Sequence, residues 1–145
     1  PLRFFDRAAE VLRVGGRLVL IEPAATPVAR PLYGLFHAEP MRRRELAPPF
    51  TCSPAADGSF ANMGMAVALF VDHRAWTEAR LAEVGLRLVE LRFSDPWAYP
   101  LSGGYSGRQL APTSLLRLLT RLEDRLPPVL HRLLGWRLRV VLEKA

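Results

Sequence analysis

A chain of 145 residues that is half hydrophobic and 23% charged is long enough for one domain with its own core, and it is neither mainly disordered nor fibrous. Its 20 basic and 14 acidic side chains leave a net charge of +6, with the surplus mainly in residues 108–145. The single cysteine, Cys52, excludes a disulfide framework and fits a reducing compartment.

The first 14 residues predict an amphipathic helix, because apolar side chains from Phe4 to Val14 recur at steps of three and four residues. Gly15 and Gly16 then supply the backbone conformations that end a helix. Residues 17–21 are almost continuously apolar, which is typical of a short strand covered on both faces. Helix, glycine turn and buried strand together predict an α/β layer with a largely parallel sheet.

Two long excursions interrupt the regular elements. Residues 23–60 are rich in proline and show no sustained hydrophobic period, so we expect a connection of the kind that forms functional lids or insertions. The second excursion starts at residue 94 and contains a Leu-rich helical stretch over residues 113–134. Pro127 and Pro128 break that stretch, because proline is not accommodated in a helix interior without a kink.

Between the excursions the sequence predicts a helix and a strand. Asp72 is a suitable N-cap for a helix that carries Trp76 and Leu81 on one side and ends at Gly85. Residues 86–93 predict a strand nearer the edge of a sheet, because charged side chains interrupt the apolar series.

Residues 136–142 predict the last strand, since the apolar positions 136, 138, 140 and 142 share one face in a two-residue period. We expect the three strands to form one sheet, with this last strand between the other two and antiparallel to both. No stretch approaches the roughly 18 apolar residues of a membrane span, so no transmembrane helix is expected.

The order of these elements resembles the C-terminal half of a class I S-adenosylmethionine-dependent methyltransferase of the type 11-like group, in a bacterial subgroup. The main evidence for this resemblance is residues 5–23, FDRAAEVLRVGGRLVLIEP, which are similar to the family's fourth crossover helix, Gly-Gly turn and fifth strand. The helix from Asp72 and the two later strands are similar to the last helix and the closing antiparallel hairpin. The family's strand order, 3-2-1-4-5-7-6, implies an α/β fold here: a partial Rossmann-like sheet of strands 5-7-6 with covering helices and two long insertions.

The resemblance implies that residues 1–145 are a single domain, the C-terminal portion of a cytoplasmic enzyme with a longer chain. The implied activity is methyl transfer from S-adenosyl-L-methionine to a small or lipid-linked acceptor. The family's glycine-rich cofactor loop, its ribose-binding acidic residue and its fourth-strand motif have no counterpart in these residues. We therefore expect the cofactor to bind the full-length enzyme, and no residue here is assigned to it.

Three acidic or basic side chains near the end of the first strand are candidates for acceptor chemistry. Glu22 stands at the edge where open α/β sheets bind ligands; it binds substrate, or it is a loop carboxylate paired with an arginine. His37 and Glu39 lie in the connection that should pass over the same edge. Neutral histidine is the best general base near neutral pH, so His37 is the catalytic candidate and Glu39 a substrate-binding one, the alternative being a solvated loop histidine. No metal site is expected, because clustered cysteines are absent.

Tyr99, Ser102 and Tyr105 place hydroxyl groups beside a cluster of glycines. They are candidates for the wall of a polar substrate site, or they form a tight turn with packed tyrosines.

Arg117, Arg121 and Arg125 fall on one helical stripe opposite a set of leucines. This pattern suggests a rival function, a non-enzymatic basic module that binds a membrane surface or an anionic polymer. The alternative is the solvated face of a helix that covers the sheet. As partners we expect a small-molecule or lipid-linked acceptor and no nucleic acid, with peripheral membrane contact as a further option.

Overall fold

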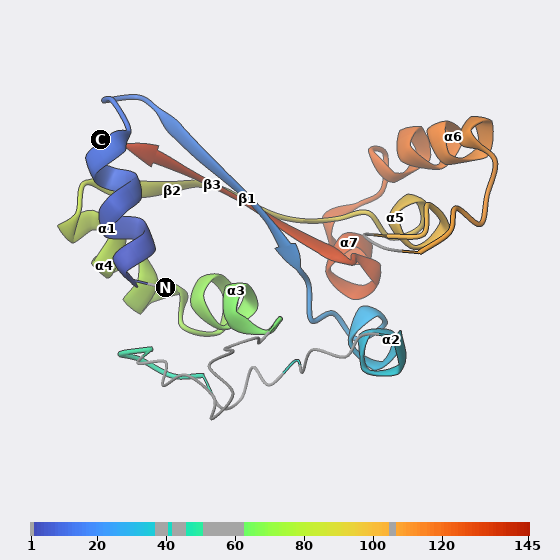
Figure 1. Ribbon diagram of the computed structural model, residues 1–145, viewed down its shortest axis with the longest axis horizontal. Coiled ribbons are helices and arrows are strands. Elements are labelled where there is room, and N and C mark those ends of the chain that lie inside the picture. The colour runs from blue at the N-terminus through green and yellow to red at the C-terminus, as the bar shows by residue number, and fades with distance from the viewer. Residues whose placement is uncertain (1, 37–40, 42–45, 51–62, 105–106) are drawn as a thin grey trace.

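The computed structural model describes residues 2–36, 41, 46–50, 63–104 and 107–145 (Figure 1). These residues form one three-stranded sheet of β1 (Arg17–Pro23), β2 (Leu86–Ser94) and β3 (Arg137–Lys144), in the order β1-β3-β2. β3 runs antiparallel to both neighbours, which confirms the expected place and direction of the last strand and the edge position of β2. The expected largely parallel sheet is wrong, because β3 separates the two strands that run in the same direction.

One face of the sheet carries the core. Leu138, Val140 and Leu142 of β3 are 0% exposed, as the two-residue period of this strand predicts. α1 (Leu2–Val11) and α4 (Arg74–Glu83) cover this face and bury Phe5 and Leu81 in the same cluster (Figure 1). Because buried apolar area is the main favourable contribution to folding, this cluster stabilises the α1, α4 and sheet unit.

The opposite face of the sheet is open along β1. Val19 and Ile21 are 50% and 56% exposed. The expectation of a strand covered on both faces is therefore wrong for the part of the chain that the structure describes. Farther along this face, Glu143 of β3 forms ion pairs with Arg17 of β1 and Arg87 of β2, so charged side chains bridge all three strands.

The glycine turn between α1 and β1 is tied to the end of β3. Gly15 has a φ of +73°, a conformation that glycine adopts without steric cost. Its N–H donates to the carbonyl of Lys144 across 2.9 Å, and the N–H of Lys144 donates to the carbonyl of Gly16 across 2.9 Å. The turn predicted from sequence thus fixes the start of β1 against β3.

The connection after β1 contains more helix than the sequence indicated. The predicted connection, residues 23–60, includes α2 (Ala29–Phe36), and α3 (Met65–Val67) and the π-helix η2 (Ala68–Asp72) follow it. The expected N-cap role of Asp72 is wrong, because Asp72 ends η2 and α4 begins at Arg74, with His73 in the N-cap position and no side-chain cap. Gly85, with a φ of +72°, follows the end of α4 as expected.

The second group of helices lies beyond the far end of the sheet from α1 (Figure 1). It comprises α5 (Ala98–Leu101), α6 (Thr113–Glu123) and α7 (Pro128–Leu134). The predicted break at Pro127 and Pro128 is confirmed, since α7 starts at Pro128. α7 packs on β2, whereas α6 packs on α5. The expectation that the Leu-rich helix covers the sheet is therefore wrong for α6, because its packed side faces α5 instead.

Candidate functional site

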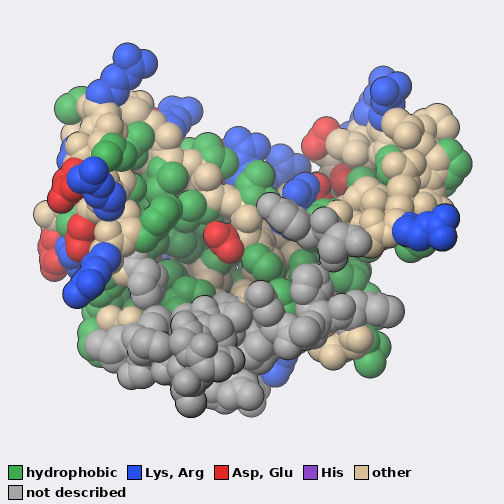
Figure 2. All heavy atoms as spheres, in the orientation of Figure 1, with side chains coloured by type: hydrophobic (Ala, Val, Ile, Leu, Met, Phe, Trp, Pro, Cys, Tyr) green, Lys and Arg blue, Asp and Glu red, His purple; other side chains and the backbone are tan. Residues whose placement is uncertain are grey.

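The candidate site lies where β1 and β2 end and β3 begins. This is the carboxyl edge of the two strands that run in the same direction, the edge at which open α/β sheets bind ligands. A cavity of about 210 Å³ opens there, and Figure 2 shows basic side chains gathered in the hollow between the two groups of helices. The cavity is lined by Ile21, Arg92, Ser94, Asp95, Thr120, Glu123, Asp124, His131, Arg137 and Arg139. We call this cavity, with the adjoining groove along α5, the sheet-end cleft.

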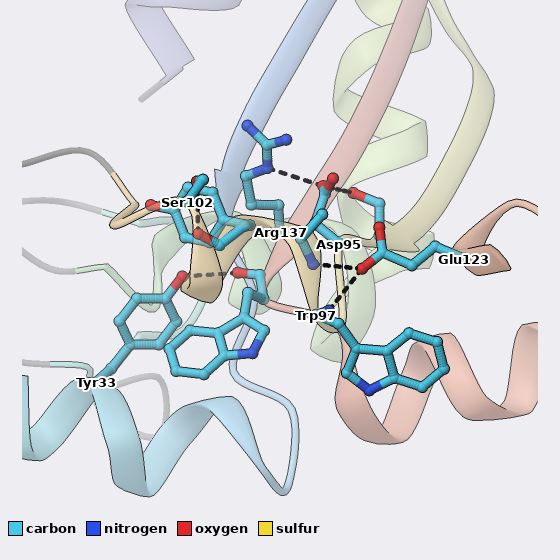
Figure 3. Close-up of polar contacts among 10 residues, drawn as sticks. Tyr33, Asp95, Trp97, Ser102, Glu123 and Arg137 are labelled. Atoms are coloured by element: carbon cyan, nitrogen blue, oxygen red, sulfur yellow. Dashed lines mark hydrogen bonds and ion pairs between the residues drawn. The ribbon is translucent and has the colours of Figure 1, made fainter. Parts of the chain in front are cut away.

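An ion pair crosses the middle of the sheet-end cleft. The Nε of Arg137, the first residue of β3, donates to Oδ2 of Asp95, which follows β2, across 2.8 Å (Figure 3). The hydroxyl of Ser94 donates to the same carboxylate oxygen. Burial alone would raise the pKa of Asp95, but the hydrogen bonds from Arg137 and Ser94 and the charge of Arg137 outweigh burial and hold that pKa below its ordinary value.

Tyr99 and Ser102 of the α5 region border the same ion pair. The guanidinium carbon of Arg137 lies 4.8 Å from the centroid of the Tyr99 ring, in a cation–π contact. Tyr99, Ser102, Thr120 and Arg137 line the groove along α5. The hydroxyl of Ser102 donates to the carbonyl of Tyr99 across 2.7 Å, so its oxygen keeps its capacity to accept a hydrogen bond from a ligand. The tight turn brings both side chains to the cleft, and a role in binding substrate stays a prediction.

A tyrosine that sequence reasoning missed holds α2 at the start of β3. The Tyr33 hydroxyl donates to the carbonyl of Trp136 across 2.7 Å, and the two rings meet edge to face at 5.2 Å (Figure 3). Burial raises the pKa of Tyr33 well above its ordinary value, so this phenol stays protonated and donating at neutral pH. No sequence signal pairs these residues, because they are 103 positions apart.

Glu123, in the last turn of α6, fixes the start of α5. One oxygen of its carboxylate accepts hydrogen bonds from the backbone N–H groups of Trp97 and Ala98, each at 2.6 Å (Figure 3). The residue is 4% exposed, so a charged group is held at the N-terminal end of a helical turn away from water. The contact sets the distance between α5 and α6, and with it the width of the cleft.

His131 contributes a buried ring nitrogen to the lining of the cleft. Its Nε2 lies 3.0 Å from the carbonyl oxygen of Glu123, and because a carbonyl only accepts, Nε2 carries the hydrogen in the neutral ring. Nδ1 is then an acceptor, and it is buried without a hydrogen-bond partner in the part of the chain that the structure describes. A ligand N–H or O–H entering from the cavity would satisfy it.

Glu22 does not join this cleft. It lies on the core face of β1 together with Leu18 and Leu20, whereas Arg137 lies on the opposite face of β3. Burial raises the pKa of Glu22 above its ordinary value, and no hydrogen bond or ion pair within the described chain holds its carboxylate. The expected arginine pair is therefore not seen among the described residues.

The structure brings Tyr99 and Ser102 to one cleft and leaves Glu22 on the other face of the sheet. His37, Glu39 and Tyr105 lie outside the described residues. Asp95, Arg137, Glu123 and His131 were not predicted as site residues. Asp95 and Arg137 carried one signal, a charged side chain at the end of a predicted strand, whereas Glu123 and His131 lie in helices and carried none.

Gly103 and Gly107 do not form a cradle for S-adenosylmethionine. A cofactor cradle needs glycines that leave space for the ligand, but a Cβ added to Gly103 would lie 2.5 Å from the carbonyl oxygen of Arg108 and 2.6 Å from that of Gly107. These glycines therefore serve the close approach of the chain to itself. Within the described residues no group of three His, Cys, Asp or Glu side chains is placed to share a metal ion.

Comparisons with protein-family models, curated proteins and solved structures gave no significant match. Within the described residues, every helix is too short or too polar to cross a bilayer.

Proposed function

We propose that residues 1–145 form the acceptor-side half of a class I S-adenosylmethionine-dependent methyltransferase, within a longer chain that binds the cofactor through other residues. The observation that carries the proposal is the strand order β1-β3-β2, with the last strand antiparallel between two strands of common direction. This is the arrangement implied by strands 5-7-6 of the family that the sequence resembles. α1 and α4 lie on the same face of the sheet, as crossover helices on one side of such a sheet would.

The position of the sheet-end cleft supports a role in holding the acceptor. Methyl transfer requires the acceptor side of an enzyme mainly to position one atom and to exclude water. Arg137 and Asp95 offer charge of both signs, and Tyr99 and Ser102 offer a ring face and a hydroxyl. A small polar acceptor, or the polar end of a lipid-linked one, fits such a lining.

A base is required only where the acceptor must lose a proton. His37 remains our candidate for this role, with Glu39 and Tyr105 as substrate-binding candidates. Glu22 stays a substrate-binding candidate from the sequence, but it is not a base for an acceptor in the sheet-end cleft. Its place near the end of β1 on the core face assigns it to the side of the sheet opposite the cleft.

Calorimetry with S-adenosylmethionine tests the proposal on the 145-residue chain and on the same chain extended upstream in its reading frame. We expect negligible binding by the first and micromolar binding by the second. Failure of the extended chain to bind overturns the methyltransferase proposal. Micromolar binding by the 145 residues alone would contradict the assignment of the cofactor site to other residues.

In the extended chain, Arg137→Gln separates acceptor binding from cofactor binding. We expect cofactor affinity unchanged and methyl transfer reduced at least tenfold, because the variant removes the charge and the ion pair at the centre of the cleft. Arg74→Gln, which removes an exposed arginine on α4, is the matched control. Equal activity of the two variants would exclude the cleft as the acceptor site.

A further inference from the structure

The outer side of α6 carries exposed leucines beside arginines. Leu115, Leu118 and Leu122 are 42%, 51% and 41% exposed, and they recur at steps of three and four residues along one stripe of the helix. Arg117 and Arg121 form the neighbouring stripe, and Arg125 follows in the turn after the helix. We call these six side chains the α6 face.

The arginines of the α6 face have no acidic partner among the described residues. No carboxylate of the described chain lies within ion-pair distance of Arg117, Arg121 or Arg125. The two acidic residues nearby are engaged elsewhere: Glu123 is turned inward against α5, and Asp124 lies 3.8 Å from Arg92. The α6 face thus presents three positive charges and three apolar side chains.

The other side of α6 faces α5. Leu116 and Thr120 line the groove along α5, and Glu123 caps the start of that helix. The exposed leucines are therefore not the packed side of the helix, and α6 lies at the end of the molecule far from α1 (Figures 1 and 2). Nothing in the described chain competes with an external partner for this surface.

We propose that the α6 face docks on an anionic lipid membrane and lies in the plane of the interface. Leucines on one stripe and arginines beside it match the two layers of such an interface, the acyl boundary and the acidic headgroups. An anionic polymer would neutralise the arginines but would leave the leucines in water, so the membrane is the partner that uses both stripes. Docking would bring the wall of the sheet-end cleft to the lipid surface. The inference does not depend on methyl transfer.

Vesicle flotation tests this docking directly. The 145-residue chain is mixed with vesicles of phosphatidylcholine, or of equimolar phosphatidylcholine and phosphatidylglycerol. We expect binding to the second and little to the first. Replacing Arg117, Arg121 and Arg125 by Gln should weaken binding roughly a hundredfold, because each basic side chain near an anionic surface contributes about fivefold. The matched control replaces Arg3, Arg7 and Arg13, three exposed arginines in and just after α1, by Gln and should weaken binding far less.

The leucines decide between a membrane and a polymer. The variant with Leu115, Leu118 and Leu122 replaced by Ser should lose vesicle binding by at least tenfold. Replacing the exposed Val11, Val14 and Leu35 by Ser is the matched control and should have little effect. Circular dichroism checks that all variants retain the fold. Vesicle binding that survives the leucine changes, or equal loss in variants and controls, overturns the proposal, as does binding to heparin with no binding to anionic vesicles.

Discussion

Arg137 and Asp95 join the start of β3 to the end of β2, 42 residues apart in sequence, through an Nε–Oδ2 hydrogen bond of 2.8 Å. Asp95 stands at a φ of +60°, a left-handed conformation that aspartate and asparagine tolerate better than most residues. Because the chain turns here from the sheet into α5, the pair fixes where Tyr99 and Ser102 lie relative to the strands. This ion pair thus anchors one wall of the sheet-end cleft.

Asp95→Asn should destabilise the protein by about 1–2 kcal/mol at pH 7, since the pair is only partly exposed. The pKa of Asp95 is lowered in the folded state, so its stabilising contribution is present above the unfolded pKa of about 3.9 and is lost as pH falls through the folded pKa. Urea denaturation at pH 7 and at pH 3 should show that the difference in free energy of unfolding between the wild type and the variant is smaller at pH 3. Glu78→Gln, in an exposed pair with Arg74, is the control and should cost less than about 0.5 kcal/mol.

Glu22→Gln should stabilise the protein at pH 7, whereas Asp95→Asn should destabilise it. Burial raises the pKa of Glu22, so its contribution to stability is full below the unfolded pKa and is lost as pH rises through the folded pKa. The variant should therefore raise the melting temperature by about 1–2 °C at pH 7 and change it little at pH 4. A lower melting temperature at pH 7 would show instead that a cationic partner holds this carboxylate, the alternative reading of Glu22 from sequence.

Glu123→Ala should loosen α5. The change leaves the partly buried N–H groups of Trp97 and Ala98 without their acceptor, which we expect to cost about 1–2 kcal/mol. Hydrogen exchange should accelerate most at these two amides. Asp124→Ala removes the neighbouring, exposed carboxylate and should leave both the exchange rates and stability nearly unchanged. Equal effects of the two variants would show that Glu123 does not act as a cap.

The strands could be predicted from sequence because short-range periodicity carries that information, whereas their order rested on the resemblance to a known family. The two-residue period of Leu138, Val140 and Leu142 marked the buried face of β3, and the paired glycines at 15 and 16 marked the turn. The covered faces could not be predicted in the same way. An apolar run such as residues 17–21 predicts a strand buried on both faces, whether or not another element lies over it.

The cleft was predicted only in part, for a different physical reason. Tyr99 and Ser102 stood out because hydroxyl groups lay beside glycines within a few residues. Asp95, Arg137 and Glu123 act through partners 25 to 42 positions away, and no local pattern encodes such contacts. A polar residue at the end of a strand is a general signal, and it gains meaning only once the strand order is known.

The open edge of β1 leads to the last prediction. β1 pairs with β3 on one side and has no strand on its other side in the described part of the chain, and Val19 and Ile21 are half exposed. The apolar run 18–21 of this edge contains no charged residue, and such a run recruits other chains through its unpaired backbone groups. We expect the 145-residue chain to self-associate at tens of micromolar, as measured by light scattering after size-exclusion chromatography.

Lysine at both outward positions should suppress this association, because charged side chains on an edge strand oppose pairing with a second chain. The variant with Val19→Lys and Ile21→Lys should elute as a monomer, while Val11→Lys with Val14→Lys, which adds the same charge at exposed sites near the end of α1, should still associate. The extended chain should also be monomeric, since the proposed function places another strand beside β1. A monomeric wild-type 145-residue chain would show that this edge is already protected, and it would count against a missing neighbouring strand.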